Sequence, residues 1–197
     1  MRSQKKEEKS NYTILGIGDS GQYVLEKLAA SNESGTFLHL HICKELSDFN
    51  AENVKSDSDT KALFLIFSPV EEEYFEFILK IESIRNATGL QIYVITNYPF
   101  LWEGNRRISM ADACLLELLR FSFTVIRIES HQWFPLKDEH GFHKVVEMVF
   151  DVAKEGVLSF IELHSANGDI KDAGNIAIGD NAHAIKRSDA YWTVERN

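Results

Sequence analysis

The sequence has neither an excess of positive charge nor a long apolar run. Its 30 acidic residues outnumber its 21 lysines and arginines, which gives a formal net charge of −9. This balance argues against general nucleic-acid binding, which needs a basic face, and weakly against binding to an anionic membrane surface. No apolar run is long enough to span a bilayer, so we expect no membrane-spanning segment.

Cysteine and proline are scarce. The two cysteines, Cys43 and Cys114, lack metal-ligand spacing, so we expect buried free thiols in a cytoplasmic protein. Residues 1–10 are charged and lack the apolar core of a signal peptide, and we expect them to form a disordered tail. The 197 residues, of which 44% are hydrophobic, suit one domain with a sizeable core.

The stretch Tyr12–Leu28 carries the most informative local pattern. A short apolar strand leads into Gly16, Gly18 and Gly21, and an amphipathic helix follows. In α/β proteins this arrangement presents backbone N–H groups to a phosphate. The spacing Gly-x-Gly-x-x-Gly is weak on its own, because the same glycines also suit a tight connection between strand and helix.

Strand and helix patterns alternate as far as residue 164. Apolar runs predict strands at residues 37–42, 62–67, 92–95 and 123–128. Helical spacing predicts helices after Ser68, from about Arg106, and over about 141–164. The alternation predicts the α/β class, with a three-layer parallel sheet covered by helices on both faces. A ligand is expected at the carboxyl ends of the strands, where the strand order reverses.

The polar segments give weaker predictions. Residues 44–61 are expected to form a loop that adds little to the core, and residues 165–173 another loop. Residues near 191–194 are expected to form either one more short strand or part of a tail. His39 and His41 share one face of an expected edge strand. Because no third ligand is near, we predict no metal site there.

The segment 60–128 resembles the FtsZ family of the tubulin superfamily. The most similar stretch has Pro-Phe at Pro99, then Trp102-Glu103-Gly104, then basic residues. The likeness continues through residues 111–119, and the long helix resembles the central helix that joins the two FtsZ domains. The resemblance implies a nucleotide-binding-type domain over residues 11–164 and a C-terminal remnant over 165–197. It also implies GTP or GDP as ligand, and assembly with itself or with an FtsZ-like filament protein.

The resemblance also implies site residues, whose roles fall into three groups. The first turn would face the nucleotide, two residues would contact ribose and guanine, and the long helix would stack on and read the base. In that order the residues are Gly16, Gly18, Gly21 and Gln22; Glu103 and Arg107; Phe142 and Glu147. Without the resemblance, Glu103 and Arg107 suit a surface ion pair or a helix cap, and Phe142 and Glu147 suit core and surface positions.

Asn167, Asp169 and Asp172 have the spacing Asn-x-Asp-x-x-Asp. This resembles the FtsZ loop that enters the neighbouring subunit's nucleotide site and promotes hydrolysis. The two aspartates would then be catalytic in an active enzyme. The same residues also suit an ordinary turn with helix caps.

One departure from the family concerns the phosphate loop. The strand at 62–67 leads into Ser68-Pro69-Val70 and three glutamates, Glu71–Glu73, where FtsZ has a loop rich in glycine and threonine. Ser68 suits an N-cap and Pro69 the first helical position, so the helix would satisfy its own N–H groups and repel a phosphate. Each missing donor to an anion weakens binding by about 1.5–3 kcal/mol.

A second departure is that nearly all of FtsZ's C-terminal domain has no counterpart here. Because the phosphate loop is lost while the spacing of the subunit-contact loop is retained, the leading hypothesis is an FtsZ-like protein with a degenerate GTP site that acts through protein contacts. The alternative is a GTPase whose activity is completed across a subunit interface. A third possibility is another ligand in the same crevice, either a small cation or a differently charged metabolite, which the acidic run at Glu71–Glu73 suggests.

Overall fold

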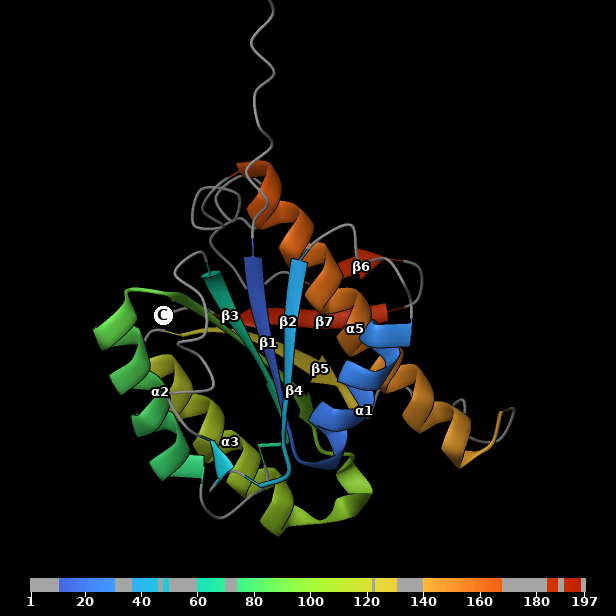
Figure 1. Ribbon diagram of the computed structural model, residues 1–197. Coiled ribbons are helices and arrows are strands. Elements are labelled where there is room, and N and C mark those ends of the chain that lie inside the picture. The colour runs from blue at the N-terminus through green and yellow to red at the C-terminus, as the bar shows by residue number, and fades with distance from the viewer. Residues whose placement is uncertain are drawn as a thin grey trace, which may run out of the picture.

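The computed structural model describes residues 11–30, 37–45, 48–49, 60–69, 74–121, 123–130, 140–167, 184–187 and 190–195. The described strands form one sheet with helices on both of its faces (Figure 1). The elements are, in chain order, β1 (Asn11–Ile17), α1 (Gly18–Ala30), β2 (Phe37–Cys43), β3 (Thr60–Phe67), α2 (Tyr74–Thr88), β4 (Gln91–Tyr98), the 3-10 turn η3 (Leu101–Glu103), α3 (Asn105–Arg120), β5 (Thr124–Glu129), α5 (Phe142–Asn167), β6 (Ala184–Arg187) and β7 (Ala190–Glu195).

The strand order is β2-β1-β3-β4-β5-β7-β6. Neighbouring strands among β1 to β5 pair in parallel, which confirms the expected α/β class and parallel sheet. The order reverses at β1, because the chain moves outward from β1 to β2 and then returns to β3 on its other side. Of the two alternatives for residues 191–194, the structure has the strand, which is β7. β7 pairs antiparallel with both β5 and β6 and extends the sheet beyond β5.

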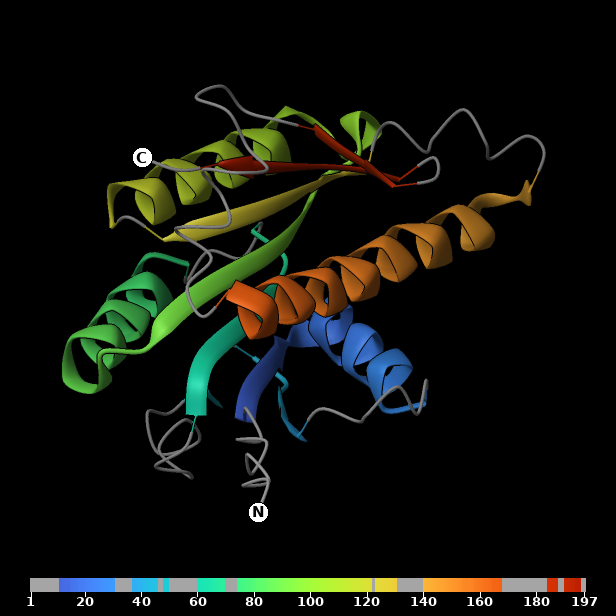
Figure 2. The same ribbon diagram turned by 90° about the horizontal axis from the view of Figure 1, so that it is seen from above.

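β3 lies at the centre of the core and is buried on both faces. Ala62, Phe64 and Ile66 pack toward α1 and α5, whereas Leu63 and Leu65 pack toward α2 and α3. Because successive side chains of a strand point to opposite faces, one continuous apolar run supplies both halves of the core. Figure 2 shows the resulting layers, with α1 and α5 on one side of the sheet and α2 and α3 on the other.

One detail of the core differs from the sequence-based expectation. Phe49 lies in the polar segment 44–61 but is only 3% exposed, and its ring packs edge-on against Phe77 at a centroid distance of 5.1 Å. That segment therefore does contribute to the core. Cys114 is fully buried on the inner face of α3. The expectation of buried free thiols is confirmed for both Cys43 and Cys114.

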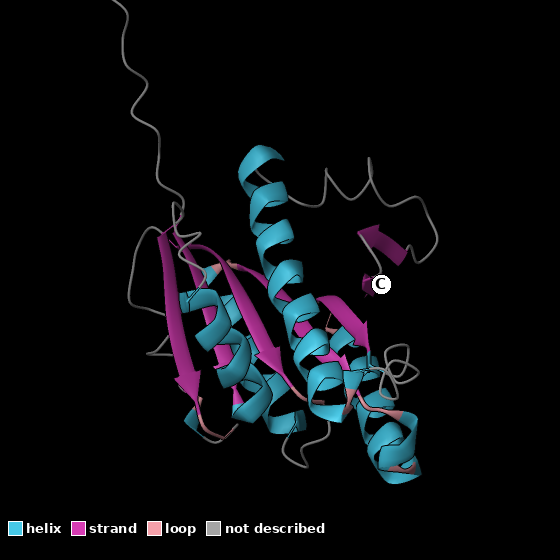
Figure 3. Cartoon of the chain, turned by 90° about the vertical axis from the view of Figure 1, so that its right-hand side faces the viewer, coloured by secondary structure: helices cyan, strands magenta, loops and turns pink. Residues whose placement is uncertain are grey.

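Helix α5 crosses the sheet beside α1 (Figure 3). Its 26 residues correspond to a length of about 39 Å, and it ends at Asn167 rather than near residue 164 as expected. Lys27 on α1 pairs with Asp151 on α5 at 2.6 Å, and this hydrogen bond raises the pKa of Lys27. The ring of Tyr23 packs against Phe150 at 4.9 Å. These contacts fix the position of α5 along α1.

Across the residues that the structure describes, no helix combines the length and the apolar character needed to cross a membrane.

Candidate functional site

The expected glycine turn is a direct corner between β1 and α1. β1 includes Gly16, and α1 begins at Gly18, whose φ of +65° makes the corner. A Cβ atom on Gly21 would lie 2.6 Å from the carbonyl oxygen of Ile66 and 2.6 Å from the carbonyl carbon of Gly16. Gly16 and Gly21 thus let α1 pack directly on the backbones of β1 and β3, a role that needs no ligand.

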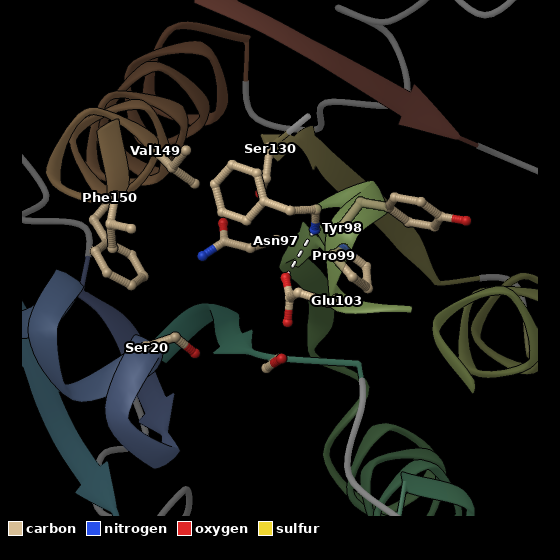
Figure 4. Close-up of a pocket in the computed structure, with 11 residues that line it drawn as sticks. Ser20, Asn97, Tyr98, Pro99, Glu103, Ser130, Val149 and Phe150 are labelled. Atoms are coloured by element: carbon tan, nitrogen blue, oxygen red, sulfur yellow. Dashed lines mark hydrogen bonds between the residues drawn. The ribbon is translucent and has the colours of Figure 1, made fainter. Parts of the chain in front are cut away.

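A pocket of about 140 Å³ lies at the carboxyl ends of the parallel strands, where a ligand site was expected (Figure 4). Ser20 follows β1, Ser68 follows β3, and Ser130 follows β5. The described residues that line it are Ser20, Ser68, Asn97, Tyr98, Pro99, Phe100, Glu103, Ser130, Val146, Val149 and Phe150. The pocket therefore lies at the carboxyl edge of the sheet next to the reversal of strand order between β1 and β3, the usual ligand position in such sheets.

The pocket combines neutral polar groups with an apolar wall. Hydroxyls come from three serines, of which Ser130 is 2% exposed, and an amide comes from Asn97. Among the described residues, Oδ1 of Asn97 is buried without a hydrogen-bond donor. Val146, Val149 and Phe150 form the wall on the α5 side. Among the described lining residues there is no lysine or arginine, so they offer no cation to an anionic ligand.

Glu103 is the implied site residue that lines the pocket, and its carboxylate is already engaged. The backbone N–H of Phe100 donates to Oε1 at 2.8 Å, and Arg107 pairs with Oε2 at 2.9 Å. The carboxylate thus caps η3 and forms the surface ion pair that the sequence left as an alternative. Arg107 is half exposed on α3 and is not among the described lining residues.

Replacing Glu103 with alanine is expected to lower the free energy of unfolding by about 1–2 kcal/mol, because it removes a backbone cap as well as an ion pair. Urea denaturation measures the change. The matched control is Glu117→Ala, which removes only the ion pair of this side chain with Arg120, one turn further along α3. We expect the control to cost about 0.5 kcal/mol or less. Equal losses in the two variants would contradict the capping role.

Phe142, the implied base-stacking residue, meets other aromatic rings of the same chain. Trp102 packs edge-on against it at 5.4 Å, and Phe100 lies at 6.2 Å. Phe100 and Trp102 stack on each other at 5.4 Å. The outer sides of this aromatic cluster stay exposed, 43% for Phe142 and 52% for Trp102. Sequence spacing could not reveal the cluster, because it joins η3 to the start of α5.

Glu147, the implied base-reading residue, does not line the pocket. It pairs with Lys144 at 3.0 Å along α5, and the residue before it, Val146, lines the pocket instead. Where the resemblance implied a polar residue that reads the base, the pocket is therefore lined by a valine. Gln22 donates to Glu26 at 2.8 Å along α1 and is likewise not among the described lining residues.

The remaining implied residues fall at the limits of the described chain. Asp169, Asp172 and Glu71–Glu73 lie outside the described residues, and Asn167 is the last residue of α5 rather than part of a loop. Pro69 lies in a turn and not in a helix, so it is not the first helical residue of α2, which is described from Tyr74.

Several lining residues were missed at the sequence level although a signal for them exists. Asn97 follows the buried part of β4, and Ser130 follows β5 directly. Polar residues at the carboxyl ends of parallel strands are candidates by topology alone. Val146 and Phe150 could be found only once the rotation of α5 about its axis was known.

Comparisons with known proteins identify the fold. No protein-family model matches the sequence, and no curated protein matches it. Among solved structures, CetZ from Methanosaeta thermophila superposes with a TM-score of 0.68 at 14% identity, covering 89% of this chain and 62% of that one. A point mutant of FtsZ from M. jannaschii gives 0.65 at 17% identity, with 85% and 62% coverage. A structure titled as an empty FtsZ dimer from M. jannaschii gives 0.66 at 16% identity, with 88% and 61% coverage.

The chain therefore has the FtsZ and CetZ fold, which confirms the fold that the resemblance implied. It spans about three fifths of the length of these proteins. At these identities the likeness establishes the arrangement of the chain and not its ligand or activity.

Proposed function

We propose that this chain is a cytoplasmic FtsZ-like protein with a degenerate GTP site, which acts through protein contacts. It would assemble with itself or bind an FtsZ-like filament protein. The observation that carries the proposal is the size and lining of the pocket at the carboxyl edge of the sheet. It is small, its described lining holds no cation, and Phe142, the aromatic residue implied for base stacking, packs against Trp102 and is not among the described lining residues.

The size of the pocket argues against a nucleotide. Pockets for ligands of drug size usually enclose about 300–1,000 Å³, and a cavity of about 150 Å³ holds one benzene. The volume of about 140 Å³ therefore suits a single small ring. Of the aromatic cluster, Phe100 lines the pocket, so a larger ligand would have to displace its ring and disturb its stacking on Trp102.

The pocket also lacks the groups that usually bind the phosphates of a nucleotide. The sequence Ser68–Glu73 holds no glycine and three carboxylates, and the lining supplies hydroxyls and an amide instead of cations. Gly21, in the first turn of α1, packs directly on β3, so that an added Cβ atom would lie 2.6 Å from the carbonyl oxygen of Ile66. A triphosphate would thus exchange its hydration for too few charged or backbone donors.

The exposed apolar face beside the pocket supports a role in protein contacts. Leu101 and Trp102 on η3 are 64% and 52% exposed, and Trp102 packs against Phe142 at the start of α5. Large exposed apolar side chains that gather in one place are typical of interaction sites. One of the superposed FtsZ structures is titled as a dimer, which adds support from the fold.

Association is expected to be independent of nucleotide. Sedimentation velocity over a concentration series should give the same result with and without GTP. The chain should also co-pellet with FtsZ filaments. Trp102→Ser is expected to weaken association about tenfold, because it removes the largest exposed apolar side chain of the face.

The control for this test is Leu79→Ser, which removes an apolar side chain of similar exposure on α2. We expect the control to associate like the unmodified chain. A chain that stays monomeric at every concentration and does not co-pellet would contradict the proposal, as would equal effects of the two substitutions.

The alternative function is a GTPase completed across a subunit interface. The spacing of Asn167, Asp169 and Asp172 favours it, together with the position of the pocket at the carboxyl edge of the sheet. Under this alternative, turnover rises more than linearly with protein concentration and falls at least tenfold on Asp172→Ala. Absence of turnover at high protein concentration would exclude it.

A further inference from the structure

We propose that the pocket bounded by Asn97, Ser130 and Val146 binds a small, uncharged, planar carboxamide. This inference rests on the proposed function, because a pocket that held a nucleotide would not be free for another ligand. Three properties of the pocket lead to this ligand class, namely its size, its hydrogen-bonding groups and its charge.

The size and the apolar wall set the body of the ligand. A volume of about 140 Å³ is close to that of a cavity that holds benzene. Val149 and Phe150 line it from α5, and Pro99 lies on the side of β4 (Figure 4). Val146 of α5 and Phe100 add further apolar lining. A flat ring with one small substituent fills such a space and keeps its faces against apolar side chains.

The polar groups set the substituent. Figure 4 shows the Asn97 side chain among the lining residues, between Ser20 and Ser130. Among the described residues its Oδ1 has no donor, and Ser130 is 98% removed from solvent. A carboxamide both donates and accepts, so it pairs with the Asn97 amide in either of its two orientations and with a serine hydroxyl. A buried polar atom without a partner is the usual mark of a missing one.

The charges exclude ionic ligands of either sign. The described lining holds no lysine or arginine, and the chain carries a formal net charge of −9, so an anion finds no counter-charge. The one carboxylate of the lining, Glu103, already accepts from the Phe100 N–H and from Arg107, so a cation finds no free carboxylate. Burial of an unpaired charge is costly, which leaves a neutral ligand.

Three molecules of the same shape test the inference. Benzamide is neutral, benzoate is an anion without N–H donors, and benzamidine is a cation. Titrations followed by amide-resolved NMR on the full chain should show saturable binding of benzamide, with shifts of the Asn97 side-chain signals. Benzoate and benzamidine should bind at least tenfold more weakly. Absence of saturable benzamide binding, or equal binding of benzoate, would overturn the inference.

Two variants and one control locate the binding. Asn97→Leu should weaken benzamide at least tenfold by removing the amide, and Val146→Phe should abolish binding by filling the pocket. The control Asn105→Leu changes an exposed asparagine at the start of α3 and should leave binding unchanged. If Asn97→Leu does not fold, Val146→Phe decides alone, since unaltered benzamide binding by that folded variant places the ligand elsewhere and overturns the inference.

A GTP titration separates this inference from the proposed function. Micromolar GTP binding would contradict the proposed function, whatever benzamide does. Weak or absent binding of both GTP and benzamide would overturn the carboxamide site alone and leave the degenerate site in place.

Discussion

Gly21→Ala is expected to lower the free energy of unfolding by about 3 kcal/mol, because overpacking of a rigid contact is costly. The added Cβ would lie 2.6 Å from the Ile66 carbonyl oxygen, closer than such atoms approach. The obstructing atoms belong to the backbones of β3 and β1, so no side-chain rotation can relieve the contact. α1 would have to move away from the sheet, which would loosen Val24 and Leu25 in the core.

The matched control for this prediction is Gly89→Ala. Gly89 has a φ of +70°, but a Cβ there would meet nothing within 4 Å. That substitution carries backbone strain without a clash and is expected to cost about 1 kcal/mol. Urea denaturation of both variants separates the two causes. A Gly21→Ala loss no larger than that of Gly89→Ala would show that α1 does not need its close approach to β3.

The Cys114 thiol is expected to react with thiol reagents about a thousandfold more slowly in the folded chain than in the unfolded chain at pH 8, because only the thiolate reacts. Burial raises the pKa of this thiol from its ordinary value of 9.0 to about 12, so the thiolate fraction falls by about three orders of magnitude. Alkylation followed by peptide mass spectrometry measures the rate at Cys114 itself. Labelling of the native protein at the unfolded rate would contradict its burial on α3.

The same pKa shift predicts how stability depends on pH. The folded pKa lies above the unfolded value, so the protonated thiol's contribution is fully present below about pH 9. As the pH rises from about 9 to about 12, the free energy of unfolding falls by up to about 4 kcal/mol, because the unfolded thiol ionises in this range and the folded thiol does not. Cys114→Ala should therefore lose less stability over this range than the unmodified chain, and the difference between the two denaturation curves isolates the thiol from other groups.

The fold was largely predictable because apolar runs report burial directly. The continuous run in β3 and the helical spacing in α2 and α3 predicted central strands and flanking helices correctly. The antiparallel pairing of β7 with β5 was not predictable, since nothing local specifies the direction in which a terminal strand returns. Phe49 was missed because one aromatic residue in a polar segment gives no periodic signal.

The site was predictable in position but not in composition. The topological rule placed a pocket at the carboxyl ends of the strands, and the resemblance pointed to Glu103, which lines it. The partners of Glu103, and the contact of Trp102 with Phe142, depend on how η3 meets α5. Val146 lines the pocket and Glu147 does not, because of how α5 is rotated about its axis. The sequence alone does not specify this rotation.

The central claim is that the pocket at the carboxyl edge of the sheet does not bind a nucleotide. Titration calorimetry with GTP and GDP tests it most directly. The chain should be freshly refolded and free of bound nucleotide, with magnesium present. The account predicts no saturable heat for either nucleotide up to millimolar concentration, because the pocket of about 140 Å³ is too small and its described lining carries no cation. Binding of either nucleotide with a micromolar dissociation constant would contradict it.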